Sequence, residues 1–480
     1  MEKSQQPPQQ NQRPFKVVIA GGGLVALTAA HILSKADIDF VVLEQHDNLT
    51  PWIGSLLVMW PATYRIFNQL GIQDAMSSIL NELEDYQTID ANDGSFLHLI
   101  KDVGKMWSRN HGYGIGVTSR PQFVETLYNS LPAGARARIR VGKRVTGVEV
   151  LPDGVRVRCA DGTAEEGTIV IGADGVHSRT RQCMEALARH GGDGKVDVDA
   201  DADADAVESP YVTTYRALIG NLPELPGLKP RQNYQGVRYG LSPQLVTGEG
   251  RGWWYVYEAL ERPARRQQRR RRQRYTEQEK RDMMDRYADV HVAPGYRLRD
   301  LYPLSVGDIG LINVEEGRVD RWTWGGRIAL VGDAVRKLDP HAGLGYNSGV
   351  GDIVELVNRL RGALLTAARD PGEGPGRHAG VPSAESLQAA FSEYERTRKD
   401  SERNVHVVSR LSARSSAWLN WSHRIISTWV MRFFPVVRWM LDYLIAPVVA
   451  RAPVLDWLEE TELPQGASPW LHHPRTTSVE

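Results

Sequence analysis

Four short runs of apolar residues along the chain have the pattern of buried parallel β-strands. They are FKVVIA at 15–20, DFVVLE at 39–44, TIVIGAD at 168–174 and RIALVGD at 327–333. Their apolar residues are consecutive rather than alternating, as in strands that are covered on both faces. The pattern therefore predicts an α/β fold built on a parallel sheet.

Other segments alternate polar and apolar residues and predict antiparallel structure. The stretch RVTGVEVLPDGVRVRCADGT at 144–163 contains a Pro-Asp-Gly turn between two alternating runs, which predicts a hairpin. PYVTTYRALIG at 210–220 and GWWYVYEAL at 252–260 have the composition of strands in a second, β-rich lobe. Helical patterns dominate from about residue 386 to the end.

Three polar segments interrupt these patterns. Residues 190–208 alternate Asp with small residues, 261–274 are strongly basic, and 369–385 are rich in Gly and Pro. Each is too polar to bury, so we expect solvated loops or linkers. Contact of the basic run with anionic lipid or with the acidic segment stays open. The polar N-terminal stretch 1–14 has no apolar core, so we expect a disordered tail and not a secretory signal.

Composition is that of a globular protein with two or three lobes. The chain has 480 residues, of which 41% are hydrophobic and 24% charged, and the formal net charge is zero. The charge balance therefore gives no argument for nucleic acid as a partner. Two cysteines, Cys159 and Cys183, are too few for a disulfide framework and favour a reducing, intracellular location. We expect no metal site.

A glycine-rich turn follows the first predicted strand. In VVIAGGGLVALTAAHIL, Gly21 allows a tight turn, Gly23 lets the backbone approach a diphosphate, and Ala26 is small enough for close helix–strand packing. The next strand ends at Glu44, whose carboxylate can bind a ribose diol and would repel the 2′-phosphate of NADP. This unit predicts a dinucleotide site but leaves FAD and NAD both open.

Two later blocks complete a pattern that resembles a known family. GADGVHSRTR at 172–181 and VGDAVRKLDPHAGLGYN at 331–347 occur in order after the first turn. Together they resemble the FAD-dependent monooxygenases of the p-hydroxybenzoate hydroxylase-like group over about residues 15–365. The chain is most similar to the fungal branch of paxilline epoxidase-like enzymes that oxidise terpenoids and meroterpenoids.

This resemblance implies an FAD-binding Rossmann-like domain interleaved with a β-sheet substrate domain, plus a helical C-terminal region. The FAD-binding parts would be 15–80, 115–189 and 305–365, and the substrate parts 81–114 and 209–304. An acidic linker at 190–208, a second linker at 366–385 and an apolar, membrane-associated region at 386–480 would complete the chain.

The resemblance also implies roles for single residues. Asp174 would organise the turn over the nucleotide, and Asp333 would accept a hydrogen bond from the ribityl chain of FAD. The other cofactor-binding residues would be Gly54, Val58, Arg120, Gly343, Gly345 and Tyr346. Where relatives have Gly-Asp-Ala-Ala-His, this chain has Gly-Asp-Ala-Val-Arg, so Arg336 would either balance charge near the flavin or be solvated.

The implied reaction uses NADPH or NADH as a transient co-substrate and O2. Oxygen would be transferred through a flavin hydroperoxide to an isoprenoid double bond, which requires a dry pocket but no acid–base pair. Tyr215 matches a tyrosine of the family's substrate-side sheet and is the catalytic candidate. An aromatic or polyketide hydroxylase of the same fold is the alternative enzyme, and a non-catalytic, membrane-associated nucleotide-binding protein is the alternative of another class.

The C-terminal region is rich in Trp, Phe and Leu but carries regular charges. Its apolar stretches are interrupted by Arg424, Arg432, Arg438, Asp442 and Arg451. A spanning helix needs about 20 mostly apolar residues, so we expect helices that lie on a membrane surface. A short span at 433–450 and a soluble helical cap remain open. The expected location is intracellular and membrane-associated, at the endoplasmic reticulum.

Overall fold

The computed structural model of the chain describes residues 14–49, 56–189, 195–197, 210–265, 275–369, 380–461, 464 and 466–474. Gly54, nearly all of the predicted tail at 1–14 and most of the three polar segments lie outside these residues. The predictions that concern them are therefore not tested by the structure.

A six-stranded sheet organises the first part of the fold. Its order is β21-β22-β12-β1-β2-β8, and the five strands from β22 to β8 are parallel. Their bounds are β1 Lys16–Ala20, β2 Asp39–Leu43, β8 Ile139–Arg140, β12 Ile169–Gly172, β21 Thr323–Trp324 and β22 Ile328–Leu330. The four apolar runs form β1, β2, β12 and β22, so the predicted parallel sheet is confirmed.

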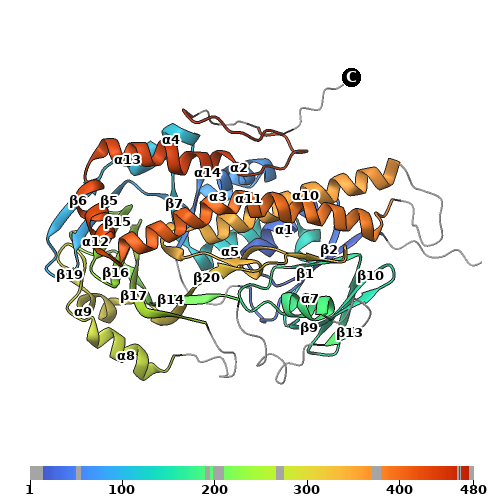
Figure 1. Ribbon diagram of the computed structural model, residues 1–480, viewed down its shortest axis with the longest axis horizontal. Helices are drawn as coiled ribbons and strands as arrows, with labels where there is room; N and C mark the ends of the chain where they lie inside the picture. The colour runs from blue at the N-terminus through green and yellow to red at the C-terminus, as the bar shows by residue number, and fades with distance from the viewer. Residues whose placement is uncertain are drawn as a thin grey trace, which may run out of the picture.

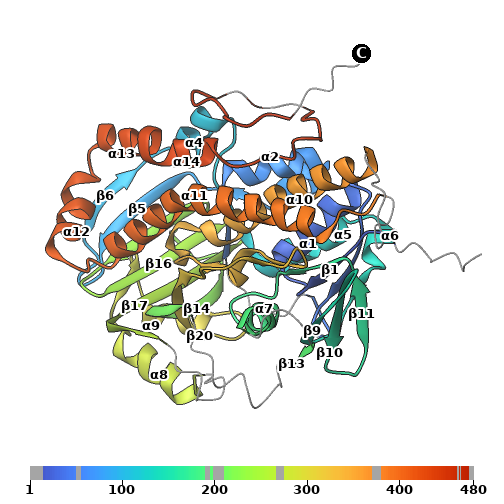
Figure 2. The same cartoon turned by 45° about the vertical axis from the view of Figure 1, so that its right-hand side comes forward.

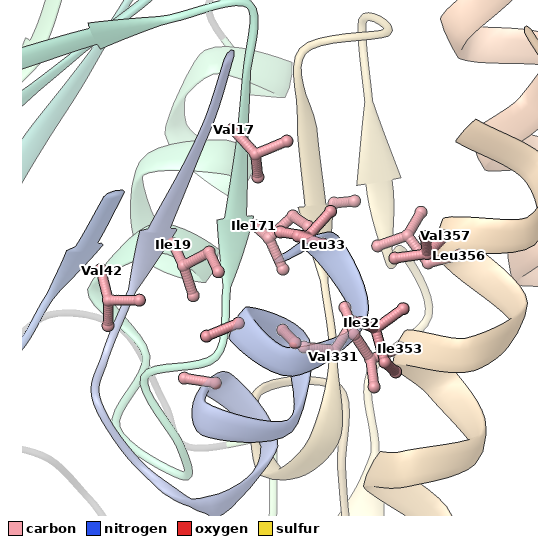
Figure 3. Close-up of a cluster of buried hydrophobic side chains, with 14 of the residues drawn as sticks. Val17, Ile19, Ile32, Leu33, Val42, Ile171, Val331, Ile353, Leu356 and Val357 are labelled. Carbon is pink, nitrogen blue, oxygen red and sulfur yellow. The ribbon is translucent and has the colours of Figure 1, made fainter. Parts of the chain in front are cut away.

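Two helices far apart in the sequence cover one face of this sheet together. They are α1 (Leu24–Lys35) and α10 (Leu344–Arg369). Figure 3 shows their shared core, where side chains of β1 and β12 meet those of both helices. The labelled core residues are Val17, Ile19, Ile32, Leu33, Val42, Ile171, Val331, Ile353, Leu356 and Val357. This packing brings the start of α10 beside the start of α1.

The predicted hairpin at 144–163 is confirmed within a small four-stranded sheet. Its order is β11-β10-β9-β13, and all its strands are antiparallel to their neighbours. The bounds are β9 Val145–Leu151, β10 Gly154–Cys159, β11 Ala164–Gly167 and β13 Lys195–Asp197. Both cysteines are buried and unbridged.

An eight-stranded sheet forms the β-rich lobe, in the order β23-β20-β14-β17-β16-β15-β5-β6. Its strands are β5 Asp85–Asp90, β6 Phe96–Ile100, β14 Val212–Pro223, β15 Gln232–Val237, β16 Leu241–Gly248, β17 Arg251–Arg265, β20 Gly310–Arg318 and β23 Arg336–Lys337. The segment predicted at 81–114 joins it through β5, which pairs in parallel with β15. The sheet also takes in β20, which lies beyond the predicted boundary at 304.

Shorter elements connect the two lobes. A three-stranded sheet has β7 (Gly116–Ser119) between β3 (Leu56–Met59) and β4 (Asn81–Glu82), and β18 (His291–Ala293) pairs with β19 (Tyr296–Arg297). The helices of these parts are α2 Pro61–Leu70, α3 Gln73–Ser77, α4 Val103–His111, α5 Arg120–Asn129, α6 Ala133–Arg136, α7 Arg179–Arg189, α8 Glu277–Arg286 and α9 Leu298–Leu301. Three 3-10 turns are η1 Tyr302–Leu304, η2 Gly332–Ala334 and η3 Pro340–Ala342.

Helices dominate the chain from Ala384 to Ala450, as predicted, whereas the described residues from 451 onward form no helix, so there the prediction was wrong. The long helix α11 (Ala384–Ser416) runs from the parallel sheet to the eight-stranded sheet (Figures 1 and 2). It is followed by α12 (Trp421–Ile425), α13 (Phe434–Met440) and α14 (Ala446–Ala450), with π-helical stretches η4 (Ile426–Val430) and η5 (Leu441–Ile445) between them. These helices lie along the outer end of the β-rich lobe (Figure 2). The α/β class with an interleaved sheet domain is confirmed.

Candidate active site

Gly21 joins the first glycine turn to the second sequence block. Its φ is +97°, and a Cβ there would lie 2.7 Å from the carbonyl oxygen of Ala173 and 2.8 Å from the Cα of Asp174. Only glycine combines this φ with such a close approach of another backbone. The turn after β1 and the turn after β12 are therefore packed directly against each other.

Gly23 leaves open space above the first turn of α1. It is the N-cap residue, with an extended conformation and no side-chain capping bond. A Cβ placed on it would meet nothing within 4 Å. The first helical turn also carries no acidic residue. Unpaired N–H groups and the helix dipole make such a terminus suitable for a diphosphate.

Glu44 supports the same turn from the end of β2. Its Oε2 accepts a hydrogen bond from the Gly22 N–H at 2.6 Å, and its Oε1 accepts one from the His46 N–H at 2.9 Å. The His46 ring lies 2.6 Å from the same Oε1. A carboxylate has about four acceptor positions, so Glu44 retains capacity for ribose hydroxyls while it holds the turn.

Only one of the two carboxylate oxygens of Asp174 accepts hydrogen bonds within the described part of the chain. Its Oδ2 accepts hydrogen bonds from the N–H and the hydroxyl of Thr180, each at 3.0 Å. Its Oδ1 is buried and has no hydrogen-bond partner in the described part of the chain. A buried acceptor without a donor is costly. The second block therefore offers a fixed acceptor for a ligand hydroxyl or N–H group.

Arg181, which the sequence analysis did not single out, connects the second block to the third. It is buried and donates to the carbonyl oxygens of Ala334 and Val176, at 2.8 Å each. Tyr211 donates to the carbonyl oxygen of Asp333 at 3.0 Å. These bonds fix the η2 turn. The only signal in the sequence was a second arginine in the HSRTR motif.

Asp333 lies in η2, directly after β22. Its carboxylate is about one-third exposed, forms an ion pair with Lys337 through Oδ2, and places Oδ1 4.0 Å from the ideal Cβ position of Gly345. The carboxylate thus faces the first turn of α10. Acceptance of a hydrogen bond from the ribityl chain by Asp333 stays a prediction.

The loop before α10 closes tightly on β3. Gly343 has φ of +64°, and a Cβ there would lie 2.4 Å from the Cβ of Val58. Asn347 clamps this contact, because its Nδ2 donates to the carbonyl oxygens of Val58 and Gly343 at 2.9 and 2.7 Å. The structure therefore brings Val58, Gly343 and Gly345 together with Asp333.

Two other predicted residues lie at the margins of this site. The Tyr346 side chain is buried in the core, where its hydroxyl lies 2.9 Å from Thr28 Oγ1 and its ring lies 5.3 Å from that of Phe123. Only its main chain is thus available to a ligand. Arg120 is exposed at the start of α5, directly after the strand that pairs with β3.

Arg336 is not solvated, which corrects one of the two expectations for it. Its side chain is 2% exposed and forms ion pairs of 2.8 Å with Asp352 of α10 and Glu402 of α11. Arg398 contacts the same two carboxylates at 2.9 and 2.5 Å. Asp352 also accepts from the Gly332 N–H at 2.9 Å, so this buried network supports the η2 turn that carries Asp333.

Tyr215 lies on β14, and its hydroxyl binds the C-terminal helix α11. The residue is buried, and the hydroxyl donates to the carbonyl oxygen of Ala413 on α11 at 3.3 Å. Burial raises the pKa of Tyr215, so the phenol stays neutral. The ring itself lies 5.6 Å from that of His341. Its catalytic role stays a prediction.

Comparisons with known proteins agree with this arrangement. The sequence profile of the FAD binding domain matches residues 14–371. FAD-dependent monooxygenase srdH of Neurospora crassa is 32% identical over 85% of this chain and 88% of its own. The chain belongs to the FAD-dependent monooxygenases. A second relative, FAD-dependent monooxygenase spyC of Aspergillus fumigatus, is 31% identical over 93% of this chain and 88% of its own.

Solved structures share the fold of this monooxygenase. Klebsiella pneumoniae HpxO, in complex with FAD and uric acid, superimposes with a TM-score of 0.68 at 21% sequence identity, over 91% of this chain and 98% of its own. The resemblance to the p-hydroxybenzoate hydroxylase-like group is thus confirmed. The family assignment also favours the enzyme over a non-catalytic nucleotide-binding protein.

The residues of the monooxygenase fit FAD. The open terminus of α1 suits the diphosphate, Glu44 the adenosine ribose, and the free oxygens of Asp174 and Asp333 suit hydroxyl donors. Val58 and Gly343 would lie beside the flavin ring. Bound FAD supplies electron transfer and oxygen activation; the chain supplies the cradle and the walls around it.

Replacing Asp333 with alanine should weaken FAD binding about 10- to 100-fold, the effect of losing one hydrogen bond to a charged group. Titration of the apoprotein with FAD, followed by flavin fluorescence, measures this. Lys337→Ala is the matched control, because it removes the ion-pair partner but keeps the acceptor. Unchanged FAD affinity and normal turnover in Asp333→Ala would refute the role of Asp333.

Proposed function

We propose that this FAD-dependent monooxygenase takes electrons from NADPH or NADH and uses O2 to epoxidise an isoprenoid double bond of a terpenoid or meroterpenoid intermediate. We place the reaction in secondary-metabolite biosynthesis, in keeping with its fungal relatives. The observation that carries the proposal is one cluster of buried apolar side chains shared by the loops near Val58, the eight-stranded sheet and the C-terminal helices.

This cluster makes the part of the β-rich lobe that adjoins the cofactor loops apolar and aromatic. Trp60 and Leu344 enter it from the cofactor loops, and Trp253 and Tyr257 from the eight-stranded sheet. The C-terminal helices add Val437, Leu441 and Val449. Transfer of oxygen to an alkene depends on orienting the double bond and on excluding water. Apolar and aromatic side chains suit both tasks.

Incubation of the flavin-containing enzyme with prenylated phenols and with linear polyprenols tests this proposal. We expect substrate-dependent oxidation of NADPH or NADH and a product that carries one oxygen atom from isotope-labelled O2. Acid opening of the product to a diol would identify an epoxide. Consumption of reduced nicotinamide that yields only hydrogen peroxide with every isoprenoid substrate would contradict the epoxidase assignment.

We further propose that the C-terminal helices bind the surface of an anionic intracellular membrane, at the endoplasmic reticulum. Within the described residues, no single helix has both the length and the apolar character to cross a bilayer. The segments Trp421–Val430 and Phe434–Ala450 have the required length and apolar character only when they are taken together. The angle between them is 114°. Two short helices joined by such a bend are each able to lie along the interface.

The exposed side chains of these helices support that placement. Six large aromatic residues are more than half exposed, namely Trp421, Trp429, Phe433, Phe434, Trp439 and Tyr443. Arginines lie among them, and Arg432 sits over the ring of Trp429 at 5.4 Å. Aromatic rings and arginines of this kind favour the headgroup level of a bilayer, and an isoprenoid substrate would partition into the same bilayer.

Replacing Trp429, Phe433 and Phe434 together with serine should lower vesicle binding at least about tenfold, because each large apolar side chain contributes roughly 1.5–3 kcal/mol when fully buried. Flotation with vesicles that contain phosphatidylserine measures the bound fraction. Leu365→Ser, which removes an exposed apolar residue of α10, is the control. Equal binding by the triple variant and the wild type would exclude this face.

Hydroxylation of an aromatic or polyketide ring is the second candidate function. One specific observation favours it, the buried pair of Asp339 and His341 beside the cofactor loop. Epoxidation of an isolated alkene gives such a pair no task, whereas a ring that carries an acidic hydroxyl does.

A further inference from the structure

Asp339 and His341 form a fixed pair in the η3 turn, immediately before Gly343. The Nδ1 of His341 lies 2.5 Å from Asp339 Oδ1, and the same oxygen accepts the His341 backbone N–H at 3.0 Å. The two side chains are 0% and 1% exposed. Ser409 of α11 donates to the Asp339 carbonyl oxygen at 3.1 Å, which anchors the turn from the other side.

The contact of Asp339 with Nδ1 makes the other ring nitrogen of His341, Nε2, a potential hydrogen-bond acceptor. A carboxylate oxygen that accepts from Nδ1 fixes the proton of a neutral imidazole on Nδ1, which leaves the lone pair on Nε2. His341 Nε2 is buried and has no hydrogen-bond partner among the described residues. A buried acceptor of this kind needs a donor, and a ligand bound beside the η3 turn would provide it.

The surroundings exclude the neighbouring tyrosines as bases. The His341 ring lies 4.0 Å from the ring of Tyr257 on β17 and 5.6 Å from that of Tyr215 on β14. Burial raises the pKa of both tyrosines, so each remains a neutral phenol. Of the charged groups nearby, Asp339 contacts the histidine, while Glu316 and Arg414 pair with each other at 3.1 Å.

We propose that His341, held by Asp339, is a catalytic base that accepts the proton of an acidic hydroxyl, a phenol or an enol, on the substrate. The O–H bond breaks, an Nε2–H bond forms, and the resulting imidazolium is stabilised by Asp339, which stays ionised. The proton returns to solvent after product release. The inference rests on the second candidate function, hydroxylation of a ring, and specifies the substrate as one with an ionisable ring hydroxyl.

This role changes what the site does to the substrate. A phenolate or enolate is more electron-rich than its neutral form, so the carbon beside the oxygen accepts an electrophilic oxygen atom more readily. The same hydrogen bond orients the ring, and an attached isoprenoid chain would then extend along the aromatic face of Trp253 and Tyr257. Asp339 acts as a positioning residue, since it sets the tautomer and orientation of the histidine.

Binding of prenylated umbelliferone and of its methyl ether to the FAD-containing enzyme tests the proposal without turnover. The phenolate of umbelliferone differs from the phenol in its near-ultraviolet absorbance, so the spectrum reports ionisation of the bound probe. We expect the wild type to raise the bound phenolate fraction at neutral pH and to bind the phenol at least about tenfold more tightly than the ether.

Three variants separate chemistry from packing. His341→Phe should bind phenol and ether equally and leave the phenol neutral. Asp339→Asn should also lose ionisation, because an amide that donates to Nδ1 moves the ring proton to Nε2. Tyr234→Phe, a buried tyrosine of β15 in a separate core cluster, should keep the ionisation. FAD content, measured for every variant, confirms that the cradle is intact.

Ionisation and affinity of the probe decide whether His341 acts as the base. Ionisation of the probe by His341→Phe, equal affinity of the wild type for phenol and ether, or no binding of either compound would overturn the proposal. Probe ionisation that depends on His341, in an enzyme that then fails to oxygenate any prenylated substrate, would uphold the base and refute the proposed oxygen transfer instead.

Discussion

Replacing Arg336 with leucine should reduce the free energy of unfolding by about 3–5 kcal/mol, the usual result of breaking a buried ion pair. The guanidinium lies between the carboxylates of Asp352 and Glu402, which are 0% and 1% exposed. Without it, Arg398 is the cation that remains in contact with both, and one negative charge is left uncompensated in the interior. Denaturant titration of the apoprotein measures the loss.

A charge-balanced double variant is the control for the Arg336→Leu prediction. Replacing Glu402 with leucine in the Arg336→Leu background restores balance, since Asp352 still pairs with Arg398. We therefore expect the double variant to be more stable than Arg336→Leu alone. Arg396→Leu removes a largely exposed arginine and should cost less than about 1 kcal/mol. A double variant that is less stable than the single one would show that packing, and not charge, decides the effect.

The buried network around Arg336 could not be predicted from the sequence. The partners of Arg336 lie on α10 and α11, and nothing local to VGDAVRK indicates that carboxylates from these two helices enclose the residue. A histidine in relatives and an arginine here suggested either a solvated group or one near the flavin. Burial of an arginine depends on carboxylates that arrive by tertiary packing, so the short motif could not predict it.

The parts that the sequence predicted well are those fixed by local geometry. Consecutive apolar residues gave the parallel strands, because burial on both faces leaves that pattern in the sequence itself. Gly21 and Gly343 stand at positive φ where another chain segment approaches. Burial of a strand on both faces and a positive φ each restrict which residues can stand at that position. Both can therefore be recognised from the sequence alone.

The Asp339–His341 pair was predictable in part, unlike the buried Arg336 network and unlike the parallel strands. The two residues are only two positions apart, so their contact was accessible from the sequence, but the burial of both side chains and the unpartnered Nε2 were not. The expectation that the reaction needs no acid–base pair came from the implied epoxidation. Likewise, the hydroxyl of Tyr215 binds α11, a helix whose position the strand pattern around Tyr215 could not give.

Substituting alanine at Gly21 and at Gly23 should separate folding from cofactor binding. At Gly21 the new Cβ would lie within 2.9 Å of three backbone atoms at a φ of +97°, so we expect the apoprotein to lose about 3 kcal/mol or more of stability. At Gly23 the φ is −73° and the Cβ meets open space. Its apoprotein should therefore remain within about 0.5 kcal/mol of the wild type.

FAD affinity should fall in Gly23→Ala by at least about tenfold, because the methyl group occupies the space through which a diphosphate reaches the N–H groups of α1. Denaturant unfolding of the apoprotein and titration with FAD measure the two effects independently. Gly134→Ala is the matched control, since its Cβ also meets open space but on α6, outside the site. If Gly23→Ala bound FAD as tightly as Gly134→Ala, the start of α1 would not be the diphosphate site. The roles of Glu44 and Asp174 as FAD ligands, which are assigned relative to that site, would then also be refuted.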